Sequence, residues 1–524
     1  MKYLLRVLVV LLAGVAAGVE AQSYRGVIRG RVTDSAGTAV SGAQVTATNQ
    51  ATSDERAVTT DGAGAFAVAE LPPGPYRLVV AAGGHRMHVE ELVLEVNQER
   101  RADVSLQLGE LTDRVEVVAP RVDVRRDSAM GTIVGSRQLV SLPLDGRNFL
   151  ELALLAAGAA PAAQGSAGSV RGDFAFSVNG AREDFNAFLL DGADNVDPKL
   201  NTVSVTPPVD AIREFEVLAS TADASFGRQG GAHVNVITRS GSNDLSGTAW
   251  EFFRNGALDA RNHFARGGDE APDYDRHQFG LSLGGPLARN RTFFFADYEG
   301  TRADEGITRI ATVPTDAQRG SAAFLPAHPI GRAILELFPR ANRDAAKGNF
   351  VSSPTQRDHV DSLDARVDHG IGDGVDLMAR YSLADRRLYE PFSGPGFSAL
   401  PGFGSNVDRR GQNAVVSATQ VFSPSLVNES RIGYNRVSSG VLPEAGVTNA
   451  RVGLPEPWRD PRAAGLSFIT VSGFSPLGPE YNNPQHGTTS ALHVADTATW
   501  ARGRHLVKLG GDARLVRQEA FRDV

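Results

Sequence analysis

The chain has 524 residues, of which 53 are Lys or Arg and 60 are Asp or Glu, so its formal charge is -7. This balance argues against nucleic acid as a partner, because proteins that bind nucleic acid carry a basic face. Cysteine is absent, which excludes disulfides, thiolate metal sites and cysteine nucleophiles. No cofactor, metal ion or catalytic residue is expected.

Residues 1–21 are predicted to form a secretory signal. Lys2 and Arg6 supply positive charge, residues 4–19 are almost wholly apolar, and the small Ala21 ends the run. The alternative is an uncleaved anchor, but the apolar run is shorter than the roughly 20 residues of a spanning helix. We therefore expect export and cleavage before Gln22.

Residues 22–110 are predicted to form a small β-sandwich. Turn motifs such as Pro72-Pro73-Gly74 separate many short β-prone runs, which is typical of this fold. The expected strands are 26–33, 43–49, 55–60, 65–70, 74–81, 89–96 and 101–108. The pieces GRVTDSAGTAVSGAQVTA and TTDGAGAFAVAELPPGPYRLVV resemble the carboxypeptidase-regulatory-like domain. That resemblance implies a prealbumin-like sandwich without catalytic activity.

Residues 111–243 are predicted to hold a linker and an α/β domain. The linker contains a β-prone run at 114–118, and such a run can add itself to the edge of another sheet. A plain extended linker, or the first strand of the next domain, is the simpler interpretation. In the α/β part, helices are expected at 136–142 and 147–157, and strands at 176–179, 187–190, 214–219 and 233–238.

Residues 244–524 are predicted to form the N-terminal part of an antiparallel transmembrane β-barrel. Nine alternating segments are expected as strands: 246–254, 277–285, 292–310, 359–369, 375–385, 412–422, 426–436, 488–500 and 505–516. Their connections alternate between tight turns and long Gly/Pro-rich stretches. Outer-membrane barrels show this alternation, with short periplasmic turns and long extracellular loops.

The junction at residues 226–254, FGRQGGAHVNVITRSGSNDLSGTAWEFFR, resembles that between plug and barrel in TonB-dependent outer-membrane receptors of the Oar-like branch. In that branch a similar Asn/Asp-rich stretch, here SVNGAREDFNAFLLDGADNVDP, lies in the plug. The matching plug positions are Asn179, Gly180, Arg182, Asn186, Asp191, Gly192, Asp194 and Asn195. The resemblance also implies a TonB-interacting segment at Asp113, Arg114, Val115, Glu116, Val117 and Val118.

Two other chemistries are weaker interpretations of the same sequence. The acidic stretch around Asp191 and Asp197 could hold calcium, but its spacing departs from the EF-hand pattern, and a polar turn is the plainer account. Gly280-Leu281-Ser282-Leu283-Gly284 fits the pattern of a hydrolase nucleophile, but it lies within a predicted strand instead of a sharp strand-to-helix turn.

The resemblance implies a receptor in the Gram-negative outer membrane. Its expected partners are the TonB protein, an extracellular ligand and outer-membrane lipid. The ligand would bind at the cell surface and pass through the plugged barrel without covalent chemistry. The alternative function is a surface adhesion or ligand-binding protein that does not transport.

The strand count predicts an incomplete barrel. Plugged outer-membrane transporters have 22 strands, whereas about nine strand candidates follow residue 244. We therefore expect the receptor to be truncated within the barrel, and the nine strands to form an open, curved sheet.

Overall fold

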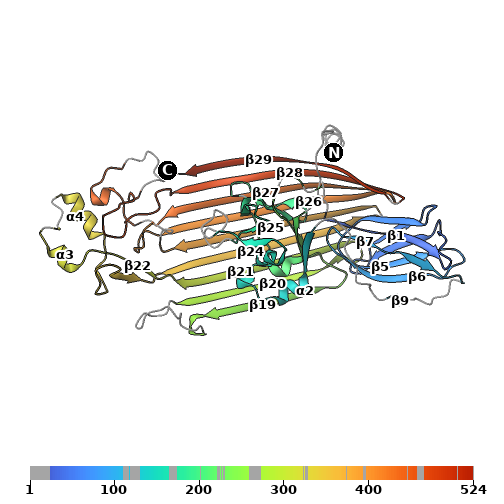
Figure 1. The fold of residues 1–524 in the computed structure, drawn as a ribbon, viewed down its shortest axis with the longest axis horizontal. Helices are drawn as coiled ribbons and strands as arrows, with labels where there is room; N and C mark the ends of the chain where they lie inside the picture. Colours follow the sequence, from blue (N-terminus) through green and yellow to red (C-terminus); the bar gives the residue numbers. More distant parts are fainter. Residues whose placement is uncertain are drawn as a thin grey trace.

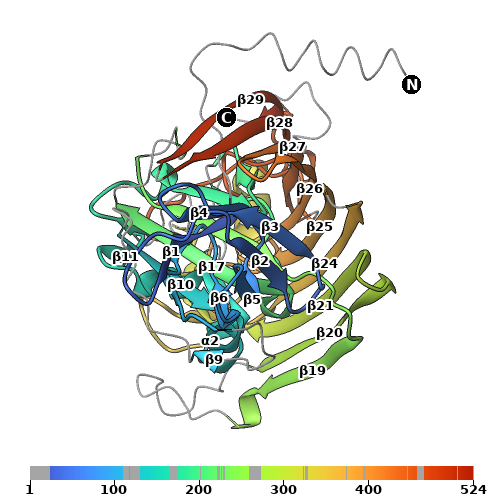
Figure 2. The same ribbon diagram turned by 90° about the vertical axis from the view of Figure 1, so that its right-hand side faces the viewer.

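The computed structural model describes residues 24–109, 117–118, 130–163, 174–200, 202–220, 225, 227, 230–258, 273–322, 324, 328–372, 374–392, 397–444, 446–456, 465–503 and 505–522. The protein has three parts: a long curved sheet, a small sandwich beyond one end of its strands, and a mixed domain on its concave side (Figure 1). Seen from the sandwich end, the curved sheet wraps around the mixed domain (Figure 2).

The N-terminal sandwich has the predicted β-rich architecture. Its strands are β1 (Gly26–Asp34), β2 (Gln44–Asn49), β3 (Glu55–Thr59), β4 (Ala65–Leu71), β5 (Gly74–Ala81), β6 (His88–Leu94), β7 (Glu99–Arg101) and β8 (Val104–Leu106). One sheet has the order β4-β1-β7, with β8 also on β1, and the other has the order β3-β2-β5-β6-β9. Alternate apolar side chains from both sheets, such as those of Ile28 and Leu78, form the buried core.

The prediction of one continuous strand at residues 101–108 is wrong. The structure divides 101–108 between β7 and β8, which pair in parallel with successive parts of β1. At the break, the Asp103 carboxylate accepts a hydrogen bond from the backbone N–H of Arg31 at 3.0 Å. A side chain thus replaces a backbone acceptor, and the ladder is interrupted there.

The mixed domain, called the plug below, surrounds a five-stranded sheet of order β10-β17-β18-β13-β14. These strands are β10 (Met130–Gly135), β17 (Ile212–Ser220), β18 (His233–Thr238), β13 (Ala187–Leu190) and β14 (Ala193–Asp194). The remaining elements are α2 (Ser136–Ser141), η1 (Asp145–Arg147), η2 (Phe149–Leu155), β11 (Ala159–Pro161), β12 (Phe176–Val178), η4 (Glu183–Phe185), β15 (Val196–Asp197), β16 (Thr202–Val203) and η5 (Val209–Ala211).

Where a helix was predicted at 147–157, the structure has the shorter 3-10 helix η2. Element η2 begins after Asn148, whose side chain accepts a hydrogen bond from the Leu150 N–H at 3.2 Å. Its buried residues recur every third position: Phe149 with Leu152, and Leu150 with Ala153. A 3-10 helix places positions i and i+3 on one face, so this spacing buries all four side chains in the plug core.

The curved sheet, called the wall below, contains the nine predicted strands. They are β19 (Ser246–Asn255), β20 (Tyr274–Ala288), β21 (Thr292–Gly306), β24 (Thr355–Ile371), β25 (Val375–Glu390), β26 (Ser405–Ser423), β27 (Leu426–Pro443), β28 (Gln485–Arg502) and β29 (His505–Arg522). Each pairs antiparallel with its neighbours in this order. Within the described residues β19 pairs only with β20, and β29 only with β28, so the sheet is open as predicted.

The wall is polar on its concave face and apolar on its convex face. On β28, Leu492 and Val494 are 41% and 38% exposed, whereas the intervening His493 is only 3% exposed. Buried polar side chains line the concave face of the other strands as well. Transmembrane barrels have this arrangement, because their outer surface meets lipid and their interior is polar. No helix in the described parts of the chain is long and apolar enough to cross a membrane.

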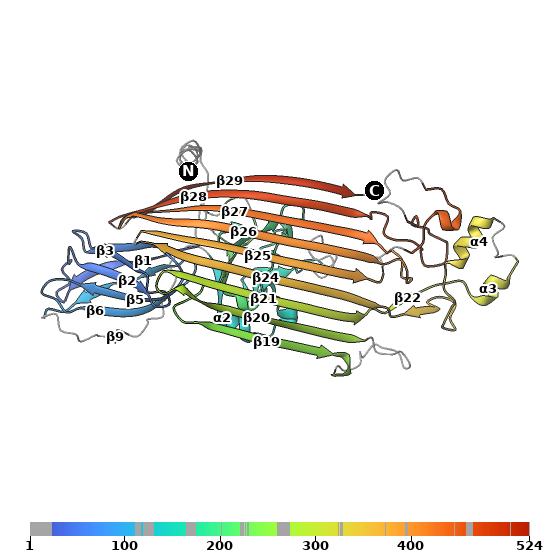
Figure 3. The same ribbon diagram turned by 180° about the vertical axis from the view of Figure 1, so that it is seen from behind.

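The two ends of the wall differ, as the predicted connections require. The short connections from β20 to β21, β24 to β25, β26 to β27 and β28 to β29 lie at the sandwich end (Figure 1). At the other end, long loops carry η6 (Gly256–Leu258), β22 (Arg309–Ala311), α3 (Asp316–Gly320), α4 (Pro329–Glu336), β23 (Phe350–Ser352) and η7 (Ala450–Val452) (Figure 3). Three of these loops share one buried apolar core that includes Phe338, Phe403 and Leu466. The sequence did not predict this packed cap.

Candidate functional site: the clasp between plug and wall

The Asp191–Gly192 dipeptide forms a tight turn at the edge of the plug. It joins β13 to β14, which pair antiparallel at Leu190 and Ala193. Asp191 has φ +48° and Gly192 has φ +72°, so both lie in the left-handed region. Hairpin turns of this kind favour Asp-Gly, because both central residues need positive φ. The local sequence therefore explains why the plug presents Asp191 at this point.

The Asp191 carboxylate connects the plug to the wall. Within the plug it accepts hydrogen bonds from the Thr238 N–H at 3.0 Å and the Thr238 hydroxyl at 2.7 Å. From the wall it accepts hydrogen bonds from Arg366 of β24 at 3.3 Å and Arg380 of β25 at 3.0 Å. The side chains of Asp191 and Arg380 are 0% exposed. Charges buried this deeply are stable only when they are paired and hydrogen-bonded.

Two wall arginines also bind the backbone of the turn. Arg380 donates to the Leu190 carbonyl at 3.0 Å, and Arg431 of β27 donates to the Gly192 carbonyl at 2.9 Å. A Cβ on Gly192 would lie 2.5 Å from the guanidinium carbon of Arg431. Glycine is thus needed at position 192 both for its backbone conformation and for this close approach.

Asparagine side chains of the wall extend the contact along the plug. Asn413 of β26 donates to the Asp194 carbonyl at 2.9 Å. Asn435 of β27 donates to the Val196 carbonyl at 2.7 Å and to the Ser204 hydroxyl at 2.8 Å. The clasp is defined here by Asp191, Gly192, Asp194, Val196 and Ser204 of the plug with Arg366, Arg380, Asn413, Arg431 and Asn435 of the wall.

The predicted plug motif divides into residues that reach the wall and residues that do not. Asn186 and Asn195 are buried, and their side chains bind backbone groups within the plug. Asn179 donates to the Ala219 carbonyl at 2.7 Å, also within the plug, and its neighbour Gly180 continues the turn. Arg182 is 75% exposed and pairs with Asp184. Only Asp191, Gly192 and Asp194 contact the wall.

The acidic residues of the motif do not form a shared cation site in the structure. Both oxygens of Asp191 accept hydrogen bonds from N–H or O–H donors, as described above. In the described residues no group of three or more His, Asp or Glu side chains is arranged to hold a metal ion. Ser282, the serine of the hydrolase-like pattern, lies within β20 and shares a hydrogen bond with Thr248 at 2.7 Å.

A second anchor, which the sequence did not reveal, joins the plug to the first wall strands. Arg147 forms ion pairs with Asp210 of the plug and with Glu299 of β21. Its guanidinium also lies 4.7 Å from the ring centroid of Phe252 and 5.5 Å from that of Trp250. Cations over aromatic rings are attracted by the ring quadrupole, so Arg147 is held by charge and by stacking.

The predicted TonB-interacting segment is only partly described. Asp113, Arg114, Val115 and Glu116 lie outside the described residues. Val117 and Val118 form the two-residue strand β9, which pairs in parallel with Val89 and Glu90 of β6. The end of the segment therefore adds itself to an edge of the N-terminal sandwich.

Comparisons with known proteins agree with this architecture. The outer membrane beta barrel domain family matches residues 237–524, and the carboxypeptidase regulatory-like domain family matches residues 27–107. The chain is 27% identical over 307 residues to the TonB-dependent transporter Oar of Myxococcus xanthus. That match covers 55% of this chain and 28% of the relative, so the chain spans well under half of the relative's length.

One solved structure shows a similar fold, and a second aligns with a lower TM-score. The outer membrane transporter YddB from Escherichia coli aligns with a TM-score of 0.51 at 13% identity, covering 75% of this chain and 48% of that one. The siderophore receptor PirA from Acinetobacter baumannii aligns with a TM-score of 0.45 at 15% identity, covering 73% and 47%. The curated relative and these proteins are named as transporters or receptors.

The outer membrane beta barrel domain family covers more than half of the chain and includes all nine strands of the wall. The chain belongs to the outer-membrane β-barrel family, its N-terminal part matches the carboxypeptidase regulatory-like domain, and it is similar to the TonB-dependent transporter Oar.

Proposed function

We propose that this receptor binds a ligand at the cell surface and moves it through the barrel when TonB acts on residues 113–118. The observation that carries the proposal is the clasp, because it holds a separate plug against the lumenal face of the wall by a few buried polar contacts. Removing one partner of a buried ion pair costs about 3–5 kcal/mol. The plug is therefore secured at rest, and a force applied to its N-terminal side can release it.

The position of the TonB-interacting segment suits this role. It follows the sandwich, whose last described residue is Gly109, and precedes the first plug strand at Met130. Tension on the segment therefore acts on both domains. Val117 already adopts a strand on the edge of β6, and TonB would bind the segment by the same strand addition.

Substitution of Val117 tests this assignment. Proline lacks the backbone N–H and disfavours strand pairing, whereas alanine keeps the N–H. We expect the purified receptor to capture the C-terminal domain of TonB with Val117 or Val117→Ala, and to lose the capture with Val117→Pro. Equal capture by all three proteins would place the TonB contact elsewhere.

The same experiment separates transport from the alternative of a non-transporting adhesion protein. An adhesin has no need of TonB, so the absence of capture by the unaltered receptor would favour that alternative. For the domains we propose a signal at 1–21, the sandwich at 22–110, the TonB-interacting linker and plug at 111–243, and the barrel from 244. The family matches and the separate sheets support these boundaries.

A further inference from the structure

The N-terminal sandwich lies across the periplasmic end of the wall. Figures 1 and 3 place it beyond the strand ends that carry the tight turns. Seen from that end, its strands lie in front of the plug and within the curve of the wall (Figure 2). Tight turns mark the periplasmic side of outer-membrane barrels, so the sandwich stands where a transported ligand would leave.

An ion pair and several hydrogen bonds fix the sandwich to the wall and its turns. Arg56 forms an ion pair with Asp376 at the start of β25. Glu70 accepts a hydrogen bond at 2.6 Å from the Thr499 hydroxyl near the end of β28. The backbone carbonyl of Ala51 accepts one at 3.0 Å from the N–H of Asn243. Asn243 also exchanges hydrogen bonds with Asn290, at 2.7 and 2.8 Å, and so belongs to the rim of the wall.

Glu70 is buried at this contact and has an unusual backbone conformation. It is 1% exposed, and its φ of +55° is uncommon for a residue other than glycine. Thr499, its partner, is 0% exposed. Backbone strain of this kind persists only where the surrounding structure enforces it, and it is concentrated at functional contacts.

Other contacts fix the sandwich to the plug. The Val96 N–H donates to the Glu214 carboxylate at 2.7 Å. Tyr24 and Val96 of the sandwich share a buried apolar cluster with Ile237 of the plug. The sandwich therefore holds plug and wall together from the periplasmic side, in addition to the clasp.

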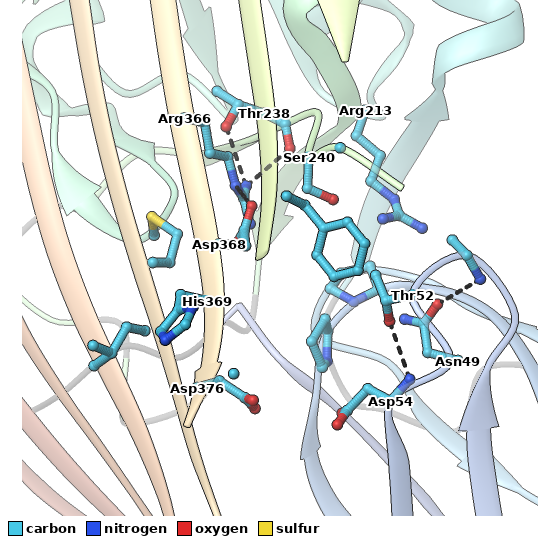
Figure 4. A pocket seen from close by; sticks show the side chains of 18 of the residues that line it. Asn49, Thr52, Asp54, Arg213, Thr238, Ser240, Arg366, Asp368, His369 and Asp376 are labelled. Atoms are coloured by element: carbon cyan, nitrogen blue, oxygen red, sulfur yellow. Dashed lines mark hydrogen bonds and ion pairs between the residues drawn. The ribbon is translucent and has the colours of Figure 1, made fainter. Parts of the chain in front are cut away.

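The sandwich also contacts the clasp through a shared residue. The Arg431 guanidinium lies 5.6 Å from the ring centroid of Tyr24, and the same side chain donates to the Gly192 carbonyl. Tyr24 and Arg366 line one cavity of about 110 Å³ at the junction of sandwich, plug and wall (Figure 4). Movement of the sandwich would thus withdraw a cation–π contact from an arginine of the clasp.

The seam with the wall is the weaker side of the docked sandwich. An open cleft of about 690 Å³ separates β3 from turn residues that include Gly372 and Pro424. Among the described residues, the Arg56–Asp376 ion pair and the hydrogen bonds from Asn243 to Ala51 and Ser53 bridge the rim beside it. The Asp376 side chain is 26% exposed beside this cleft, so its ion pair with Arg56 can be replaced by contacts with water. The Glu70–Thr499 hydrogen bond and the apolar cluster shared with the plug are buried.

We propose that the N-terminal sandwich is the periplasmic gate of this receptor. Docked on the wall, it blocks the exit and stabilises the clasp. When TonB pulls residues 113–118, the sandwich leaves the wall at the Arg56, Glu70 and Ala51 contacts, and the plug then moves. This gate rests on the proposed function, and it assigns a mechanical role to the carboxypeptidase-regulatory-like domain.

A disulfide between sandwich and rim tests the gate. Positions 51 and 243 are joined by a backbone hydrogen bond at 3.0 Å, which makes them a candidate pair for a disulfide, whose Cα atoms lie about 4.4–6.8 Å apart. The chain has no cysteine, so Ala51→Cys with Asn243→Cys gives a single defined lock. Ser204→Cys, at a clasp position that is 4% exposed, serves as the reporter of plug movement.

The reporter is labelled with N-ethylmaleimide in cells, with and without the proton motive force, and read by mass spectrometry of the peptide that contains position 204. With Ala51→Ser and Asn243→Ser as the matched control, we expect TonB-dependent labelling. With the disulfide formed, we expect this labelling to be lost, and reduction of the disulfide to restore it. Restoration on the same protein excludes misfolding as the cause.

The outcomes separate the gate from the function on which it rests. TonB-dependent labelling of equal rate in locked and control receptors would overturn the gate alone. No TonB-dependent labelling in the control receptor would overturn the proposed function, and the gate with it.

Discussion

At the scale of single residues, the Asp191 carboxylate of the plug is shared by two buried arginines of the wall. Replacing it with alanine leaves Arg366 and Arg380 buried without their shared carboxylate. We expect Asp191→Ala to destabilise the seated plug by about 3–5 kcal/mol. The measurement is limited proteolysis of the plug in outer-membrane fractions. Arg182→Ala, in the same motif but exposed, is the control and should leave the cleavage rate unchanged.

Substitution of two glycines can distinguish the cost of backbone strain from the cost of losing the contact with Arg431. Gly180 and Gly192 have φ of +76° and +72°, and a Cβ meets nothing within 4 Å at Gly180 but meets Arg431 at Gly192. Gly180→Ala should cost about 1–2 kcal/mol, the penalty of the left-handed conformation. Gly192→Ala should cost more, because the methyl group also displaces Arg431 from the Gly192 carbonyl. Equal losses in thermal unfolding would mean that Arg431 does not hold the turn.

We expect Asp54 to make docking of the sandwich depend on pH, because the Asp376 carboxylate of the wall lies near it. Burial, and then the neighbouring Asp376 carboxylate, raise the pKa of Asp54 above its ordinary 3.8. If the pKa of Asp54 is higher in the docked state than in the undocked state, protonation of Asp54 stabilises the docked state at low pH. This stabilisation is lost as the pH rises through the pKa that Asp54 has in the docked state. Docking should therefore tighten on acidification.

The substitution Asp54→Asn should tighten docking at neutral pH, because it removes a charge that opposes the docked state. Slower maleimide labelling of Asn243→Cys in the Asp54→Asn background would show this. Glu55→Gln, which removes the adjacent charge, is the control. Faster labelling with Asp54→Asn would mean that the Asp54 charge stabilises the docked sandwich.

At the scale of elements, the wall strands followed from the sequence because alternation is a local signal. The pattern gave all nine strands. The outer ends of most were underestimated, whereas the predicted strand 292–310 extends beyond the end of β21 at Gly306. Beyond the lipid, both faces of a strand are polar, as at Arg386 and Arg387 of β25, and alternation disappears there. The helices α3 and α4 have only five and eight residues, too few for a clear helical period.

The partners of the clasp could not be predicted in the same way. Alternation places Arg366 and Arg431 on the concave face, but it does not identify what they bind. The bond from Arg366 to Asp191 joins residues 175 apart in the sequence, and that from Arg431 to Gly192 joins residues 239 apart. The Asp-Gly turn was visible as a motif because its left-handed conformations depend on adjacent residues.

The convex face of β27 gives a prediction about lipid contact. Ile432 and Leu442 both lie on this face, each 47% exposed, but Ile432 lies near the middle of the strand and Leu442 near its loop end. Arginine at the bilayer midplane costs about 2–4 kcal/mol, and about 0–1 kcal/mol near the interface. Ile432→Arg should therefore destabilise the folded protein in lipid vesicles much more than Leu442→Arg. Equal effects in urea titrations would argue that this face does not meet lipid.

At the scale of the whole molecule, three domains are fastened to one another around the clasp. The plug is held by the wall arginines, and the sandwich covers the periplasmic end and reaches the same Arg431 through Tyr24. The segment on which TonB is proposed to act lies between sandwich and plug in the chain. A single pull can therefore act on both attachments.

The most direct test of this account is the accessibility of Ser204→Cys in living cells when residue 117 is valine, alanine or proline. We predict that N-ethylmaleimide labels position 204 in energised cells with Val117 or Val117→Ala, and that a protonophore or Val117→Pro abolishes the labelling. Labelling that is equal in all three receptors, or indifferent to the proton motive force, would contradict the claim that TonB opens the clasp by pulling this segment.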